Sequence, residues 1–183
     1  SNAAFTSNPS HTAGSFSWTP QTADGRDNPY PVVFSATNAI VGTATTQVKV
    51  DRKPVITVPA TFAASEGAPL TITVVAADPD GQAINSLIPN LSSLPPGNNA
   101  VFTPAAGNTG GILTWTPTYD DSRVTPYVVT FTAVNNLTGA GAVAITVANT
   151  DRAPQVTADT TAAAVGDQAL TVHVTAADPD GQT

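Results

Sequence analysis

The sequence repeats itself at a fixed distance, and this repeat constrains the fold more than any other feature. The six residues ADPDGQ occur at positions 77–82 and again at 177–182. DRKP at 51–54 recurs as DRAP at 151–154, so both pairs of motifs are one hundred residues apart. Self-similarity at a fixed period indicates a chain built from repeated structural units.

A second set of matches is separated by 97 residues and covers the other half of the unit. FSWTP at 16–20 aligns with LTWTP at 113–117, and Tyr30 aligns with Tyr127. The three-residue difference between the two distances falls within residues 38–51, where the first copy is the shorter one.

These matches predict one complete module between two partial modules. The complete module spans residues 52–150. Residues 4–51 correspond to the last four strands of a preceding module, and residues 151–183 correspond to the first two strands of a following one. The first three residues, SNA, are interpreted as the remnant of a cleaved tag.

The complete module has the pattern of an all-β domain. Apolar Leu70, Ile72 and Val74 alternate with threonine or with a second apolar residue, which is typical of a strand with one buried face. Strands are expected at residues 55–62, 70–77, 101–116 (two strands), 127–134 and 142–147, with one more after Gln82. Short strands separated by turn motifs, in a unit of about one hundred residues, predict an Ig-like β-sandwich.

The composition excludes several classes of function. The chain has 13 acidic residues and 6 basic ones, and the basic residues are scattered, so we expect no nucleic-acid partner. Its longest apolar run, AVAITVA at 142–148, is far shorter than the ~20 residues that cross a bilayer, so no membrane insertion is expected. The absence of cysteine excludes disulfides and thiolate metal sites.

A characteristic series of motifs runs along the module. It consists of EG before residues 70–77, DPDG after them, then LPPG, WTP and the DRAP-type linker. This series resembles the bacterial putative-Ig or cadherin-like tandem repeats of secreted and surface proteins, over the complete module and both partial ones. The resemblance implies an Ig-like (cadherin-like) fold and a non-catalytic role in a secreted or cell-surface protein. Two departures stand out: Gln82 and Gln182 replace the family's usual aspartate, and Glu66 has no counterpart at Gly166.

Acidic residues are expected to gather at the second joint, between the complete module and the next one, because loops of a sandwich alternate between its two ends. The residues concerned are Glu66, Asp120, Asp121, Asp151, Asp178 and Asp180. Like charges in one place require neutralisation, and Ca²⁺ takes several carboxylate oxygens at once. Together with the resemblance to cadherin joints, this predicts a calcium site.

The first joint gives a weaker prediction of the same kind. Its candidate metal ligands are Asp51, Asp78 and Asp80, with Asp24 and Asp27 nearby. Four basic residues, Arg26, Lys49, Arg52 and Lys53, are close in the sequence and favour ion pairs over metal. At both joints the alternative is that DPDG is a turn motif and that its acids serve turns and ion pairs only.

The aromatic residues have structural interpretations. Trp18 and Trp115 occupy the same place in two modules, inside alternating strands, which favours the core over a sugar-binding platform. Tyr30 and Tyr127 begin a strand and suit a tyrosine corner. Tyr119 has no aromatic equivalent and is expected to be exposed.

No enzymatic function is expected. The two histidines, His11 and His173, do not recur between modules and have no partner at the spacing of a metal site or catalytic triad. The leading hypothesis is an adhesive or spacer module, whose partners are the other repeats of its own protein and a surface protein or glycan. The alternative is a carbohydrate-binding accessory domain of a secreted hydrolase.

The two partial modules are nearly complementary. Residues 153–177 of one chain are therefore expected to complete residues 5–50 of another, which predicts head-to-tail self-association.

Overall fold

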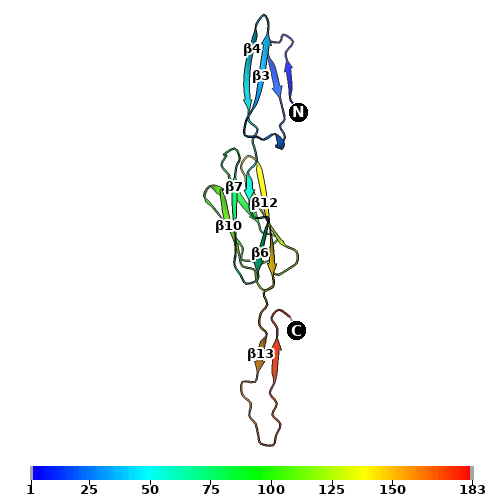
Figure 1. Cartoon of the computed structure of the whole chain (residues 1–183), viewed down its shortest axis with the longest axis vertical. Coiled ribbons are helices and arrows are strands. Elements are labelled where there is room, and N and C mark those ends of the chain that lie inside the picture. The colour runs from blue at the N-terminus through cyan, green and yellow to red at the C-terminus, as the bar shows by residue number, and fades with distance from the viewer. Residues whose placement is uncertain (1, 182–183) are drawn as a thin grey trace.

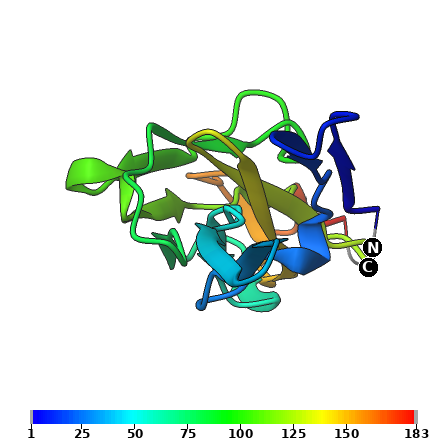
Figure 2. The same cartoon turned by 90° about the horizontal axis from the view of Figure 1, so that it is seen from above.

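The computed structural model describes residues 2–181, which form three parts arranged end to end (Figure 1). Ser1, in the expected tag remnant, and Gln182 and Thr183, at the end of the third module, lie outside the described residues. In the view along the long axis the three parts overlap (Figure 2). The chain is therefore elongated, and its N-terminal and C-terminal parts lie at opposite ends.

The middle part is a sandwich of two four-stranded sheets. Its strands are β5 (Val55–Thr57), β6 (Thr61–Ser65), β7 (Leu70–Ala77), β8 (Ser86–Asn90), β9 (Val101–Pro104), β10 (Gly110–Trp115), β11 (Tyr127–Val134) and β12 (Thr138–Ala148), with one short 3₁₀ helix at Ala106–Asn108. The sheet orders are β5-β7-β10-β9 and β6-β12-β11-β8. Neighbouring strands are antiparallel except β6 and β12, which are parallel. The all-β, Ig-like fold is thereby confirmed.

The core lies between these sheets because alternate side chains of β7 and β11 face inward. Trp115 and Phe131 are among its largest fully buried side chains. Burial of one large apolar side chain contributes roughly 1.5–3 kcal/mol. The buried core consists of Leu70, Ile72, Val74, Ala76, Ile84, Leu87, Leu94, Leu113, Trp115, Tyr127, Val129, Phe131, Ala133, Val143, Ile145 and Val147.

Some of the observed strand boundaries agree with those predicted from the sequence. The strands expected at 70–77 and 127–134 coincide with β7 and β11. The single strand expected at 55–62 is wrong, because β5 and β6 are separate strands in different sheets. Pro59 lies between them and has no N–H for a sheet, so the chain leaves one sheet there and joins the other.

The N-terminal part holds four strands in two antiparallel pairs. They are β1 (Ala4–Ser7) with β2 (Gly14–Ser17) and β3 (Tyr30–Thr37) with β4 (Val41–Val48), and a 3₁₀ helix spans Thr22–Asp24. Tyr30 pairs with Val48 as Tyr127 pairs with Ile145, so the strands are the equivalents of β9 to β12 at a distance of 97 residues.

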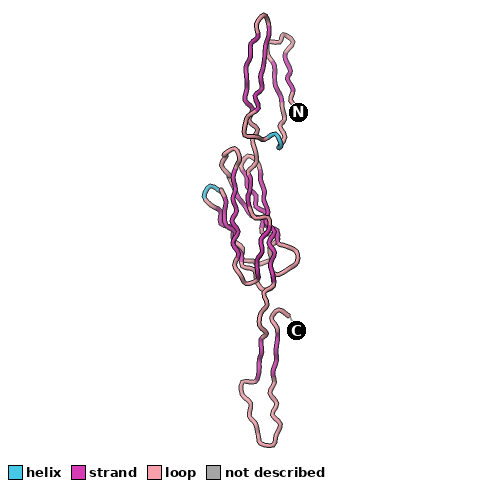
Figure 3. Tube along the Cα trace, in the orientation of Figure 1, coloured by secondary structure: helices cyan, strands magenta, loops and turns pink. Residues whose placement is uncertain are grey.

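The C-terminal part holds one antiparallel pair, β13 (Gln155–Ala158) and β14 (Val174–Ala177). Val156 pairs with Ala176 as Ile56 pairs with Ala76 in the middle module. These strands are therefore the equivalents of β5 and of the last half of β7. A long loop without strands joins them (Figure 3).

Candidate functional site: the joints between modules

The first aspartate of each DPDG motif builds its own turn. Asp78 Oδ1 accepts hydrogen bonds from the backbone N–H groups of Asp80 (2.8 Å) and Gln82 (3.3 Å). Gly81 donates to the carbonyl of Asp78 at 3.1 Å and has a φ of 77°, which glycine adopts without strain. Asp178 repeats the bond to Asp180 N–H at 2.8 Å. Turn chemistry accounts for this half of the motif.

The second aspartate of each motif binds the arginine of the DR linker. Asp80 Oδ2 accepts the backbone N–H of Arg52 at 2.8 Å, and Asp80 Oδ1 lies 2.9 Å from Arg52 Nη2. Arg52 Nη2 also donates to the carbonyl of Pro79 at 2.6 Å. We call this set, Arg52 with Pro79 and Asp80, the first clamp.

The second clamp consists of Arg152, Pro179 and Asp180. Arg152 donates its backbone N–H to Asp180 Oδ2 at 2.6 Å and its Nε–H to Asp180 Oδ1 at 2.8 Å. Its Nη2 donates to the carbonyl of Pro179 at 2.7 Å. The two repeated motifs, DPDG and DR, are therefore the two halves of one contact between a loop and the linker that precedes the same module.

Both clamp carboxylates are held in the charged form. The side-chain hydrogen bond from Arg52, followed by that from Lys49, sets the pKa of Asp80 far below its usual range. At Asp180 burial acts to raise the pKa, but the backbone and side-chain bonds from Arg152 outweigh it and the pKa is lowered. Hydrogen bonds to the ionised form stabilise that form, which is the physical cause in both cases.

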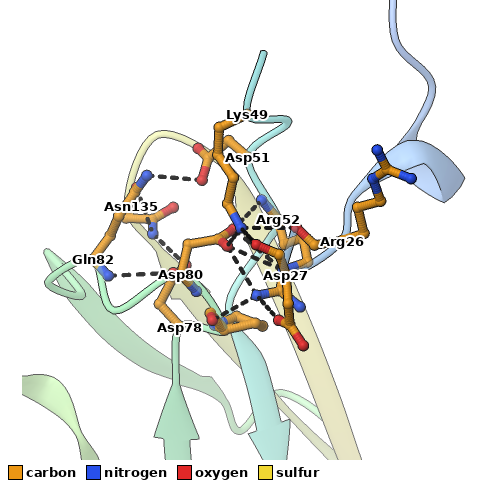
Figure 4. A network of polar contacts seen from close by, with 10 residues as sticks. Arg26, Asp27, Lys49, Asp51, Arg52, Asp78, Asp80, Gln82 and Asn135 are labelled. Carbon is orange, nitrogen blue, oxygen red and sulfur yellow. Dashed lines mark hydrogen bonds and ion pairs between the residues drawn. The ribbon is translucent and has the colours of Figure 1, made fainter. Parts of the chain in front are cut away.

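The first joint also ties the N-terminal part to the middle module (Figure 4). Lys49 Nζ lies 3.0 Å from Asp80 Oδ1 and donates to the carbonyls of Arg26 (2.7 Å) and Asp27 (2.8 Å). Arg52 Nη2 lies 2.8 Å from Asp27 Oδ1. Asp80 thus pairs with cations, as the ion-pair alternative predicts for this joint.

Gln82 has a role that an aspartate at that position would not fill. Its Nε2 donates to Asp51 Oδ1 at 2.7 Å (Figure 4). Asn135 joins the same network by donating to Asp78 Oδ2 at 2.8 Å and to Gln82 Oε1 at 3.3 Å. A carboxylate has no N–H donor, so the glutamine provides a bond to the linker that an aspartate could not make.

At the second joint, two of the predicted acids accept backbone hydrogen bonds. Glu66 is 2% exposed, and its two carboxylate oxygens accept the N–H of Ser122 (2.7 Å) and of Thr150 (3.0 Å). Burial acts to raise the pKa of Glu66, but these bonds outweigh it and the pKa is lowered. Asp121 is 6% exposed and accepts the N–H of Thr118 at 2.6 Å. Both acids fix the end of the middle module.

The second joint does not fit a calcium site in this arrangement. Glu66, Asp121 and Asp180 already have backbone or arginine donors, while Asp120 and Asp151 are exposed. Within residues 2–181, no three His, Cys, Asp or Glu side chains form a group that could hold a metal ion. Calcium at this joint, and at Asp51, Asp78 and Asp80 of the first, remains a prediction that rests on the gathering of acids in the sequence and on the resemblance.

The two joints differ in the length of their linkers. Val50 is 8% exposed and corresponds to Val147 at the end of β12, but Asp51 follows Val50 directly. The second linker has residues 148–150 at this point. The three-residue difference therefore lies at the joint, where it brings Lys49 within reach of Asp80.

The sequence correctly predicted the tyrosine corners but missed the arginines above them. The hydroxyl groups of Tyr30 and Tyr127 donate to backbone carbonyls six residues earlier, at 3.0 and 2.8 Å. Arg26 and Arg123 lie over these two rings, 3.4 and 3.5 Å from the ring centroids. An arginine four residues before each tyrosine, at the same distance of 97 residues, is the signal that could have revealed this contact.

The remaining aromatic residues and the two histidines differ in how they are buried and what they contact. Trp115 is 2% exposed, which confirms its place in the core, and Tyr119 is 41% exposed, as expected. The guanidinium of Arg152 lies 4.6 Å from the Tyr119 ring centroid, a contact across the second joint. His11 contacts Ser7 Oγ at 3.2 Å in an exposed loop, and His173 lies 3.6 Å from an aspartate on the surface.

No family model and no curated protein matches the chain. Among solved structures, a variant of the SrpA adhesin from Streptococcus sanguinis is 14% identical with a TM-score of 0.43, and the match covers 55% of this chain and 58% of that one. A group of domains from titin is 13% identical with a TM-score of 0.43, over 98% of this chain and 60% of that one. The BIgI domain of the beta protein from S. agalactiae, bound to CEACAM1, is 17% identical with a TM-score of 0.38, over 54% of this chain and 100% of that one.

The chain therefore spans about 60% of the length of the first two structures. At these identities and scores, no ligand or partner is transferred to it. In the part of the chain that the structure describes, no helix is long and apolar enough to cross a membrane.

Proposed function

We propose that the chain is a stretch of a tandem Ig-like array in a secreted or cell-surface bacterial protein. In this role it acts as a spacer that extends other domains away from the surface or as an adhesive segment. The observation that carries the proposal is the recurrence of the clamp: the same three residues, one hundred positions apart, hold the linker at both joints. A contact repeated at each linker suits a protein whose task depends on its length and direction.

The chemistry of the clamp supports this role. Its arginine donates from both backbone and side chain, and its carboxylate is 7% exposed at the first joint and 5% exposed at the second. Ion pairs that are shielded from water are weakened less by salt than exposed ones. An array stiffened in this way keeps its shape in the saline medium outside a cell.

Small-angle X-ray scattering of the dilute chain tests the proposal. The double variant Arg52→Ala/Arg152→Ala removes both clamps, and Lys53→Ala removes an exposed cation beside them. We expect the double variant to have a shorter mean maximum dimension and a more flexible scattering profile than the wild type, with Lys53→Ala unchanged. An unchanged profile for the double variant would contradict the spacer proposal.

The carbohydrate-binding alternative has one observation in its favour. Trp18 and Tyr30 line a cavity of about 730 Å³ in the N-terminal part, where a sugar ring could stack. However, the equivalent Trp115 and Tyr127 are 2% and 4% exposed in the middle module, so their position is a core position. Binding of the chain to a glycan panel, lost in Trp18→Ala, would favour the alternative over the spacer.

A further inference from the structure

The outward face of one sheet of the middle module consists of uncharged side chains. This sheet is β5-β7-β10-β9, with β7 and β10 at its centre (Figure 1). Alternate residues of its strands point away from the core and are exposed. All of them but Ala77 are β-branched, so their side chains are stiff at χ1. The ten outward residues are Val55, Thr57, Thr71, Thr73, Val75, Ala77, Val101, Thr103, Ile112 and Thr114.

Four apolar residues of this face form a straight diagonal line, with one residue from each strand. Val75 of β7 pairs with Gly110 of β10, two residues before Ile112. The same step of two residues, in the same direction, leads from Val55 to Val75 and from Ile112 to Val101. Diagonal neighbours of this kind are about 7–8 Å apart, within reach of long side chains. We call these four residues the stripe; they are 51% (Val55), 49% (Val75), 46% (Ile112) and 56% (Val101) exposed.

The neighbouring modules do not carry the stripe. Their strands pair in the same register, so the equivalent positions are known. The fold therefore does not require apolar residues there. Exposed apolar side chains that gather on one face mark an interaction surface. The equivalents of Val101, Ile112, Val55 and Val75 are Ala4, Ser15, Gln155 and Thr175.

We propose that two copies of this chain associate side by side through the stripe. A two-fold pair uses the same patch on both partners, so the patch has to match its own image. A straight line meets this condition, because the stripe of one copy can lie along the stripe of the other. The stiff β-branched side chains add to the fit, since they lose little conformational freedom when they are covered.

The distribution of charge favours a second copy as the partner. The chain has a net charge of −7, so two copies repel each other wherever their acidic groups meet. The stripe face lets two copies touch without bringing like charges together, and it offers no ion pair to a charged partner. The charged residues of the middle module lie at its two joints: Arg52, Lys53, Asp78 and Asp80 at the first, and Glu66, Asp120, Asp121 and Arg123 at the second.

The side-by-side pair is one form of the adhesive role proposed above, but it involves neither clamp. Removing the clamps changes the scattering profile of the single chain, and removing the stripe changes its association. Failure of one proposal is therefore distinguishable from failure of the other.

Sedimentation velocity of the 183-residue chain over a concentration series tests the proposal. The wild type should show a weight-average mass that rises from 18.5 kDa towards twice that value. A fourfold variant gives the stripe the residues of the neighbouring modules, which the same strands already tolerate, and it should remain at 18.5 kDa. This variant is Val55→Gln/Val75→Thr/Val101→Ala/Ile112→Ser.

A matched pair of single variants locates the contact on one face. Ile112→Asp places a charge in the middle of the stripe and should also remain at the monomer mass. Ile88→Asp places the same charge on β8 of the other sheet, at a position that is 61% exposed, and should associate like the wild type. Far-UV circular dichroism checks that each variant keeps its strands.

Three results would overturn the side-by-side pair. The first is a wild type that stays monomeric up to millimolar concentration. The second is a rise in mass that the fourfold variant leaves unaltered, because the contact would then use another surface. The third is an equal loss of association in Ile88→Asp and Ile112→Asp.

Discussion

Asp80 Oδ1 lies 2.9 Å from Arg52 Nη2, although 28 residues separate the two in the sequence. Asp180 and Arg152 repeat the relationship with a contact of 2.8 Å. In each case the aspartate belongs to a loop and the arginine to the linker, so the direction in which the chain enters a module is fixed by side-chain chemistry.

Removing the charge of Asp80 should lower the melting temperature of the chain. Asp80→Asn keeps the side chain's size, but it leaves Arg52 and Lys49 facing a neutral amide. Differential scanning calorimetry measures the change. The control Asp167→Asn makes the same charge change in an exposed loop and should leave the melting temperature unaltered. Equal effects of the two variants would contradict a specific role for the clamp.

The clamp also predicts a pH dependence. Hydrogen bonds from Arg52 lower the pKa of Asp80 in the folded state, whereas an unfolded aspartate has a pKa of about 3.9. The stabilisation is therefore complete above about pH 4 and is lost as the pH falls towards the lowered pKa. The difference in urea midpoint between the wild type and Asp80→Asn should be constant from pH 6 to about 4 and shrink below that. A difference that persists unchanged at pH 2 would count against this assignment.

Glu66 should matter more for stability than the exposed acids near it. Glu66→Ala leaves the half-buried N–H groups of Ser122 and Thr150 without their acceptors, which costs on the order of 1–3 kcal/mol of unfolding free energy. Asp120→Ala removes an exposed carboxylate from the adjacent loop and should change the free energy by less than about 0.5 kcal/mol. Urea denaturation of both variants makes the comparison, and a loss at Asp120 as large as that at Glu66 would refute it.

Calcium binding is tested by melting the chain in EDTA and in millimolar calcium. The calcium prediction expects a rise in melting temperature that Asp151→Ala abolishes, since a bound ion stabilises the folded state by mass action. An unchanged melting temperature would instead support the arrangement in which Arg152 and backbone N–H groups bind these acids.

The sequence was sufficient for the fold and for the positions of the joint residues. Inward and outward residues alternate regularly in β7 and β11, so the sequence predicted the boundaries of these strands. The break at Pro59 between β5 and β6 was not predicted. At the second joint the acids were predicted to share a calcium ion, with ion pairs as the alternative, and at the first joint ion pairs were favoured. Asp80 and Asp180 bind the arginines of their own linkers, as the ion-pair interpretation expects. The common distance of one hundred residues for DR and DPDG was the available signal for this pairing.

The partners of Glu66 could not have been read from the sequence. They are backbone N–H groups of Ser122 and Thr150, which any residue except proline carries. Their position depends on how the loop and the end of β12 fold, and residue type says nothing about it. For the same reason the effect of the shorter first linker became visible only when Lys49 was found beside Asp80.

The central claim is that the first clamp, together with the contacts of Lys49 and Asp27 to it, fixes the N-terminal part against the middle module. A distance measurement across the joint tests this claim most directly. The chain has no cysteine, so Val33→Cys and Ile112→Cys, both at exposed positions, accept one spin label each. Double electron–electron resonance on the dilute, doubly labelled protein then gives the distribution of distances between the two labels. We predict one narrow distribution that broadens strongly when Asp80→Asn is added. A distribution that is already broad with the clamp intact, or one that stays narrow without it, would contradict the account.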